Sequence, residues 1–148
     1  IYIYQQCRKS EEQELKKIYK KLGIKSTVSN YFHKIYEIFK KADLIISRSG
    51  GSTITEIIAS GKPSFLIPLP NSLDNHQTEN AYELKNNNAC ILFEQKDFSE
   101  KKLSEKLNMV LSNKSFLREM SINAKSIYKK DAAKNLIDLI LLTRKEIN

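Results

Sequence analysis

The stretch Asp43-Leu-Ile-Ile-Ser-Arg-Ser-Gly-Gly-Ser-Thr-Ile-Thr-Glu56 sets the expected fold of this chain. Leu44 to Ile46 is a short apolar run, as in a strand buried on both faces, and the glycines that follow let the backbone turn without a Cβ penalty. The residues after the turn predict a helix whose N-terminus faces that turn. Its free backbone N–H groups and positive dipole end suit a phosphate group.

The rest of the chain alternates between strand and helix patterns. Apolar runs predict strands over residues 1–6, 25–28, 44–47, 64–67 and 90–93. Apolar spacings of three and four predict helices over residues 11–22, 31–41, 52–60, 77–86, 99–111, 115–128 and 132–142. Strands separated by helices pair in parallel with right-handed crossovers. We therefore expect one α/β domain over residues 1–148, a Rossmann-like doubly wound parallel sheet.

Composition limits the function classes. The 148 residues carry a formal net charge of +8 and a pI near 9.4. The basic residues form solvated helix faces or meet anionic lipid headgroups. Nucleic acid is not expected, because no aromatic-interleaved basic strand, helix-turn-helix or zinc spacing is present. The main basic clusters are Lys16, Lys17, Lys20 and Lys21; Lys101, Lys102 and Lys106; and Lys125, Lys129, Lys130 and Lys134.

Three further features are informative by what they lack. Cys7 and Cys90 have neither metal-ligand spacing nor a disulfide pattern, which favours small buried or half-buried thiols. The sequence has no run of about 20 apolar residues, so it predicts no membrane span. The chain opens at Ile1 inside a strand-like run and without a methionine, so we expect it to be a piece of a longer polypeptide.

Polar residues follow two neighbouring predicted strands. Ser47, Arg48 and Ser49 follow one strand, and the segment from Pro68 to Gln77 follows the next. Ligands of such sheets bind at the carboxyl ends of the strands, so both loops are expected to face one crevice. The dinucleotide pattern G-x-G-x-x-G and the P-loop pattern are both missing, which argues against a nicotinamide, a flavin or a P-loop nucleotide.

Glu56 allows two interpretations. The run from Thr53 to Glu56 fits a capping box, in which Thr53 caps the helix and Glu56 reaches back to a backbone N–H. Alternatively, a carboxylate in the first helical turn, beside a phosphate held at the same terminus, can accept both hydroxyls of a ribose in charge-assisted hydrogen bonds. Ser52 and Thr53 likewise serve either as caps or as phosphate ligands.

The run from Ala42 to Glu56, with Gly61-Lys-Pro63, Ile67-Pro68 and Asp74-Asn-His-Gln-Thr-Glu-Asn-Ala81, resembles the carboxy-terminal domain of the MurG family of bacterial peptidoglycan glycosyltransferases. The resemblance spans essentially the whole chain. It implies the donor-binding half of a GT-B glycosyltransferase. These enzymes transfer N-acetylglucosamine (GlcNAc) from UDP-GlcNAc to lipid I and thereby form lipid II.

The resemblance also implies roles for individual residues. Glu56 would bind the ribose, and Gln77, with His76, would contact the GlcNAc hydroxyls. Phe32 would offer backbone groups to uracil at the start of the helix predicted over 31–41, with Tyr31 and Ile35 lining the pocket. On periodicity alone, these three residues would be core. Arg48 would act by its charge near the diphosphate or by packing the loop, while Asp74 and Asn80 would shape the loop. The predicted diphosphate turn comprises Ser49, Gly50, Gly51, Ser52 and Thr53.

Further expectations concern what the chain lacks. Neither a cofactor nor a metal ion is expected, because no Asp-x-Asp lies near the predicted phosphate site and the acidic residues do not cluster as magnesium ligands would. The resemblance implies that the general base and the lipid I site belong to an amino-terminal domain absent from this chain. It also implies peripheral attachment to the anionic cytoplasmic face of the bacterial inner membrane.

Two other classes stay open. One is a related GT-B enzyme, the eukaryotic-type two-subunit N-acetylglucosaminyltransferase, whose catalytic subunit shares the Asn-His-Gln loop. Arg48, Thr53 and the run from Asp74 to Thr78 favour the bacterial family over it. The other is a non-enzymatic basic module that binds membranes or nucleic acid through its lysine faces.

Overall fold

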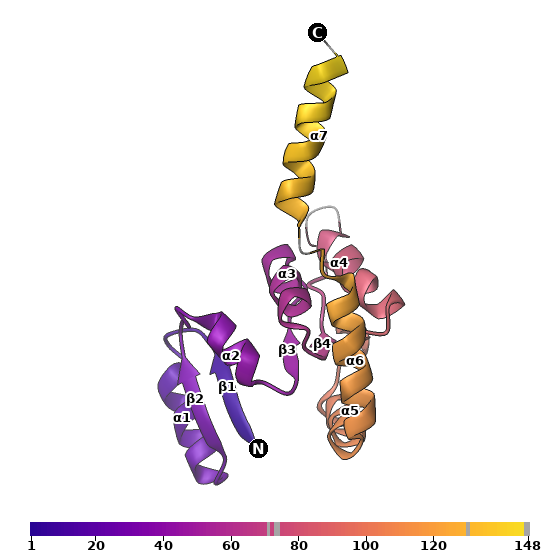
Figure 1. Cartoon of the computed structure of the whole chain (residues 1–148). Helices are drawn as coiled ribbons and strands as arrows, with labels where there is room; N and C mark the ends of the chain where they lie inside the picture. The colour runs from indigo at the N-terminus through magenta and orange to yellow at the C-terminus, as the bar shows by residue number, and fades with distance from the viewer. Residues whose placement is uncertain (71, 73–74, 130, 147–148) are drawn as a thin grey trace. The chain divides into compact units, whose positions relative to one another are not determined.

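The chain forms two compact units in a computed structural model, residues 1–42 and residues 43–148. Figure 1 shows the elements of both. The structure describes residues 1–70, 72, 75–129 and 131–146. Each unit is described by itself below.

The first unit is a parallel two-stranded sheet with two helices. It contains β1 (Tyr2–Gln6), α1 (Glu12–Lys21), β2 (Lys25–Ser29) and α2 (Ile35–Lys41). Tyr2 lies opposite Lys25 and Gln6 opposite Ser29 in the β1–β2 ladder. α1 packs on the sheet through Tyr19, whose hydroxyl donates a hydrogen bond to the Gln5 side-chain oxygen. α1 ends at Lys21, and Gly23 follows its C-cap residue with a φ of 66°, a conformation that favours glycine.

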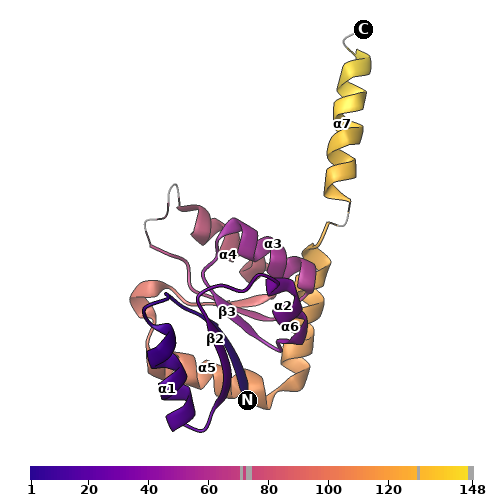
Figure 2. The same cartoon turned by 90° about the vertical axis from the view of Figure 1, so that its left-hand side faces the viewer.

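The second unit holds a parallel three-stranded sheet in the order β3-β4-β5. Its strands are β3 (Ile45–Ser47), β4 (Ser64–Leu66) and β5 (Cys90–Leu92). The helices around them are visible in Figure 2, and α3 contacts both α4 and α6. The helical segments are α3 (Gly51–Ser60), α4 (His76–Asn86), η2 (Gln95–Asp97), α5 (Glu100–Ser112), α6 (Lys114–Ile127) and α7 (Ala132–Glu146).

The core of the second unit centres on the middle strand. Phe65 is fully buried and packs with Phe93 and Val110 in one cluster. The rings of Phe65 and Phe93 lie 5.5 Å apart between centroids at a tilt of 58°, a favourable aromatic arrangement. The strand residues Ser64, Phe65 and Leu66 are all buried. The side chains therefore hold β4 firmly, and its carboxyl end has a fixed position.

Most sequence-based expectations about the elements are confirmed. The α/β class and the parallel pairing hold, although the ladders of the described residues form two sheets. The helix expected over residues 31–41 begins only at Ile35. Residues 31 and 32 lie outside it because the Ser29 hydroxyl bonds both the N–H and the carbonyl of Tyr31 and holds a local turn. The single-domain expectation stays a prediction.

Two further expectations can be checked here. Cys7 is half-buried and Cys90 is buried, and both are free thiols. Burial raises the pKa of the Cys90 thiol to about 12, so this side chain stays protonated at neutral pH and is unreactive. Among the helices of the described residues, none has the length and apolar character needed to cross a bilayer.

Candidate functional site

The turn between β3 and α3 ends in a helix N-terminus with unused donors. Gly50 is the N-cap, and the first intrahelical bond of α3 runs from the Ile54 N–H to the Gly50 carbonyl. The N–H groups of Gly51, Ser52 and Thr53 donate to no atom of the described residues. These three amides lie at the positive end of the helix dipole. They form a set of donors suited to an anion.

The glycines of this turn are not required by the backbone. Gly50 has φ −63° and ψ 148°, values that any residue can adopt, and Gly51 opens the helix. A Cβ built on either glycine would meet nothing within 4 Å. The turn is free of a Cβ penalty, as expected, but other residues would meet none there either. What the two glycines do provide is a helix entrance without side chains, where another molecule can approach the backbone closely.

Glu56 lies one turn further along the same helix. It is the sixth residue of α3, so it belongs to the second turn and not to the first. The capping-box interpretation is wrong, because Gly50 is the N-cap and no side chain caps the helix. Glu56 is exposed, and its carboxylate has no hydrogen-bond or ion-pair partner among the described residues. The side chain can therefore accept hydrogen bonds from a ligand without breaking an internal contact.

Ser49 and Asn80 join the turn to α4. The buried Ser49 hydroxyl donates to the Gln77 carbonyl at 2.6 Å, and the Asn80 amide donates to the Ser49 carbonyl at 3.1 Å. Asn80 therefore holds the turn before α3, and its expected role in shaping the loop near Asp74 stays a prediction. The Ser49 side chain is occupied inside the protein, so a ligand role of Ser49 is limited to its backbone.

Gln77 is fixed at both its backbone and its side chain. Its Oε1 accepts a hydrogen bond from the Leu69 N–H at 3.0 Å, and its own N–H donates to the Ser72 hydroxyl at 3.4 Å. These bonds tie the first turn of α4 to the loop that follows β4. The role of Gln77 as a sugar ligand stays a prediction.

Arg48 bonds to protein oxygens. Its Nη1 donates to the carbonyl oxygens of Ile67 and Pro68 at 3.1 and 3.2 Å and to Gln95 Oε1 at 2.6 Å. Of the two roles considered for this arginine, these contacts support packing of the loop. The guanidinium links the carboxyl ends of β3 and β4 to η2.

His76 and Asp74 are the two remaining candidates from the run Asp74 to Ala81. His76 is the first residue of α4 and is exposed, and it follows Asn75, which has a left-handed φ of 57°. Asn tolerates this conformation better than most residues. Asp74 lies outside the described residues, so its expected role is untested.

The residues expected to bind uracil lie in the first unit. Tyr31 is 58% exposed, and its ring stands edge-on to His33 at 5.0 Å between centroids. Phe32 is half-buried and precedes α2, and Ile35 is the first residue of that helix. The expectation that Phe32 enters a helix is therefore wrong. The Phe32 N–H has no acceptor among the described residues, so it is available to a ligand.

Sequence reasoning missed two participants, Gln95 and Leu69. Gln95 lies 47 residues from Arg48, and Leu69 takes part only through its backbone N–H. Neither belongs to a motif. Gln95 also lines a pocket of about 270 Å³, together with residues that include Pro68, Tyr82 and Lys96.

Comparison with known proteins gives the family. Residues 1–136 match the model of the glycosyltransferase family 28 C-terminal domain. The chain belongs to this family. Two curated relatives are named UDP-N-acetylglucosamine--N-acetylmuramyl-(pentapeptide) pyrophosphoryl-undecaprenol N-acetylglucosamine transferase. The one from Brucella canis is 36% identical over 139 residues, and the one from Vesicomyosocius okutanii is 38% identical over 143 residues.

A solved structure agrees. The crystal structure of Acinetobacter baumannii MurG matches this family 28 domain with a TM-score of 0.84 and 28% sequence identity, over 95% of this chain and 41% of the other. The two sequence alignments cover 94% and 97% of this chain, but only 37% and 41% of the relatives. The chain therefore spans about two fifths of the length of the proteins it matches.

Proposed function

We propose that this family 28 domain is the donor-binding half of an inverting N-acetylglucosaminyltransferase that moves GlcNAc from UDP-GlcNAc to lipid I in peptidoglycan synthesis. The observation that carries the proposal is the entrance of α3, where three unpartnered amides and two bare glycines precede an exposed carboxylate. The names of the relatives supply the substrates.

The diphosphate is assigned to the amides of Gly51, Ser52 and Thr53. A diphosphate needs several hydrogen-bond donors, and a helix N-terminus supplies both donors and a favourable dipole. No side chain stands over the two glycines, so phosphate oxygens can reach the amide nitrogens. Ser52 and Thr53 belong to the same turn, and their hydroxyls would add further donors.

Glu56 is assigned to the ribose. It lies three to five residues beyond the three amides on α3, a rise of about 4.5 to 7.5 Å along the helix. A single carboxylate can accept from both the 2′- and the 3′-hydroxyl. The uracil roles of Tyr31, Phe32 and Ile35, and the sugar role of His76, stay predictions from family resemblance.

The chemistry requires little more from this half. In an inverting transfer the acceptor hydroxyl attacks the anomeric carbon as UDP leaves, and negative charge develops on the β-phosphate. Amides already aimed at that phosphate stabilise the charge without reorganising. We assign no catalytic residue, cofactor or metal ligand to this chain. The general base and the lipid I site would belong to the amino-terminal half, so the chain alone should bind donor without transferring it.

A thermal shift experiment tests the proposal. UDP-GlcNAc at 100 times its dissociation constant should stabilise the domain by about 2.7 kcal/mol, both with and without EDTA. UDP-glucose should act more weakly. A basic non-enzymatic module would instead respond to DNA or anionic vesicles and not to UDP sugars, which would refute the proposal. A shift abolished by EDTA would refute metal independence alone.

Replacing Gly51 by alanine separates stability from binding. The new methyl group meets no atom of the protein, and alanine is the better helix former, so stability should stay unchanged or rise by up to about 1 kcal/mol. UDP affinity should fall, because the methyl group occupies the space assigned to the phosphates. Urea denaturation and calorimetric titration measure the two effects.

Gly61→Ala is the matched control. Gly61 has a φ of 59°, and a Cβ there would overlap the Lys125 side chain, so this variant should lose stability while its folded fraction keeps UDP affinity. Unchanged UDP affinity in Gly51→Ala would contradict the phosphate assignment.

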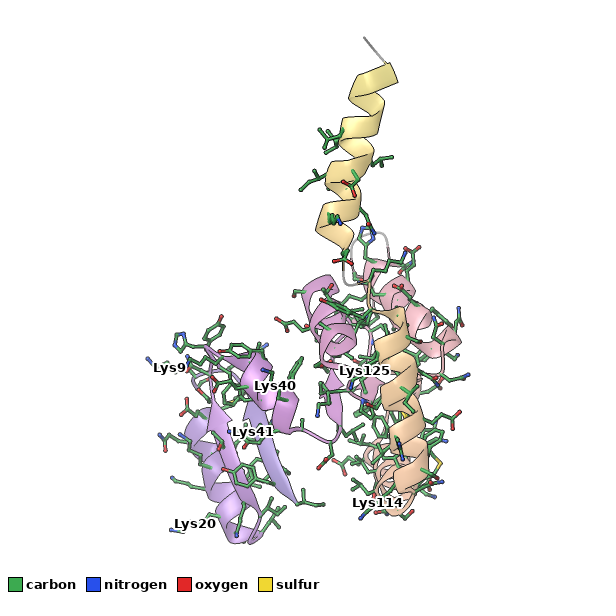
Figure 3. The ribbon with its side chains drawn as sticks, in the orientation of Figure 1. Lys9, Lys20, Lys40, Lys41, Lys114 and Lys125 are labelled. Carbon is green, nitrogen blue, oxygen red and sulfur yellow. The ribbon has the colours of Figure 1, made fainter. Side chains whose placement is uncertain are left out.

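We also propose that the domain works at the anionic cytoplasmic face of the inner membrane, where its lipid acceptor would lie. The charge is uneven: residues 1–42 hold ten lysine and arginine residues and four glutamates, a net charge of +6 out of the total of +8. Lys9, Lys20 and Lys41, labelled in Figure 3, are exposed members of this set. Each basic residue near an anionic surface contributes about 1 kcal/mol.

Vesicle flotation tests the membrane assignment. Phosphatidylglycerol vesicles should bind the protein at low salt and release it at high salt, whereas phosphatidylcholine vesicles should not bind it. Lys20→Gln/Lys21→Gln on α1 should weaken binding roughly 30-fold, since two charges are lost. The control pair Lys101→Gln/Lys102→Gln lies on α5 in the nearly neutral second unit and should have little effect. Equal losses would contradict a surface on the first unit.

A further inference from the structure

A network of hydrogen bonds, called the circuit below, connects Arg48, Leu69, Gln77 and Ser49. It is closed by the peptide links from Pro68 to Leu69 and from Arg48 to Ser49. Arg48 holds the carbonyls of Ile67 and Pro68. The next N–H along the chain, that of Leu69, donates to Gln77 Oε1. The Gln77 carbonyl then accepts from the hydroxyl of Ser49, the residue after Arg48. Two loops and the start of α4 are thereby fixed with respect to one another.

The circuit decides which way the Gln77 amide faces. A backbone N–H can only donate, so the atom of Gln77 that meets Leu69 must be the oxygen. The NH₂ group of Gln77 then faces the other way, and it has no acceptor among the described residues. Gln77 therefore presents a hydrogen-bond donor and not an acceptor.

We infer that Arg48 is a positioning residue for the sugar of the donor: by fixing the segment from Ile67 to Leu69, it holds the Gln77 amide so that its NH₂ group points at a sugar oxygen. This inference rests on the proposed function, because it assumes that Gln77 faces the sugar. Arg48 acts through the loop and makes no contact with the nucleotide. Loss of Arg48 should thus affect recognition of the sugar and leave recognition of UDP unchanged.

Arg48 reaches its three acceptors through one terminal nitrogen, and a shorter side chain would not reach them. Nη1 reaches three oxygens from two loops, one of them on the Gln95 side chain. Lysine keeps the positive charge, but its ammonium ends one bond short of the position of Nη1, from which all three bonds are made. Arg48→Lys therefore removes geometry and keeps charge, whereas Arg48→Gln removes both. If Arg48 acted by its charge at the diphosphate, Arg48→Gln would lose UDP affinity and Arg48→Lys would keep it. If Arg48 positions Gln77, both variants keep UDP affinity and lose UDP-GlcNAc affinity.

Calorimetric titration of the full chain with UDP and with UDP-GlcNAc tests the inference. For Arg48→Lys and Arg48→Gln we expect UDP affinity within twofold of the unsubstituted protein and UDP-GlcNAc affinity lowered roughly three- to tenfold, the size of one hydrogen bond. Arg118→Lys on α6, an exposed arginine, is the matched control and should change neither. Gln77→Glu keeps an acceptor for the Leu69 N–H but loses the donor, so it should show the same selective loss.

The double variant Arg48→Lys/Gln77→Glu tests the route of action. If Arg48 works through the Gln77 amide, UDP-GlcNAc should bind the double variant no more weakly than Gln77→Glu alone. Additive losses, equal losses for UDP and UDP-GlcNAc, or unchanged affinities in both Arg48 variants would each overturn the inference. Failure of the unsubstituted protein to bind either ligand would refute the proposed function itself. If an Arg48 variant does not fold, Gln77→Glu still tests whether the Gln77 NH₂ group binds the sugar.

Discussion

Glu56→Gln is expected to weaken binding of UDP and UDP-GlcNAc roughly 10- to 100-fold, because hydrogen bonds to a charged acceptor contribute about 1.5–3 kcal/mol. The melting temperature should hardly change, since Glu56 is exposed and its carboxylate has no partner among the described residues. Glutamine is also a good helix former, so α3 should persist. Calorimetric titration and thermal denaturation of the same preparation measure both quantities.

A ligand without ribose hydroxyls provides the control. 2′,3′-Dideoxy-UDP should bind the unsubstituted protein weakly and lose no further affinity in Glu56→Gln. Glu105→Gln, at an exposed glutamate on α5, should leave UDP binding unchanged. An equal loss for UDP and its dideoxy analogue would show that Glu56 does not contact the ribose.

Phe65→Ala is expected to lower the free energy of unfolding by about 3–5 kcal/mol. Phe65 is fully buried on the middle strand and packs against Phe93 and Val110, so truncation leaves a cavity that strands on both sides prevent from closing. Domains of this size have stabilities of about 5–15 kcal/mol, and the variant should be partly unfolded at moderate urea concentrations. Urea denaturation followed by circular dichroism measures the loss.

Phe65→Leu serves as the graded control, with an expected loss well below that of alanine because most of the volume is kept. Tyr82→Ala, at an exposed aromatic residue of α4, should cost little. If Phe65→Ala cost no more than Tyr82→Ala, the core would not be centred on β4.

The elements could be predicted because their signals are local. The run from Leu44 to Ser47 and the run from Ser64 to Ile67 are apolar over strand length, and the structure has strands inside both. The start of α2 could not be predicted from the spacing of Phe32, Ile35 and Phe39, because the Ser29 hydroxyl holds the Tyr31 backbone in a turn. A single side-chain contact outweighed the apolar pattern there.

The candidate site was predicted only in part. The spacing of Thr53 and Glu56 fits a capping box, but the helix begins two residues before Thr53, so both residues are already helical. The sequence also could not show whether the turn requires glycine, because that depends on the φ angles of Gly50 and Gly51. The contacts of Arg48 join residues 19, 20 and 47 positions apart, and no local pattern encodes them.

The central claim is that the entrance of α3 binds the donor diphosphate while Glu56 binds its ribose. A crystal structure of this chain with UDP-GlcNAc tests it most directly. We predict phosphate oxygens within hydrogen-bond distance of the amides of Gly51, Ser52 and Thr53, and both ribose hydroxyls on the Glu56 carboxylate. A nucleotide bound elsewhere, with these amides still unpartnered, would contradict the account.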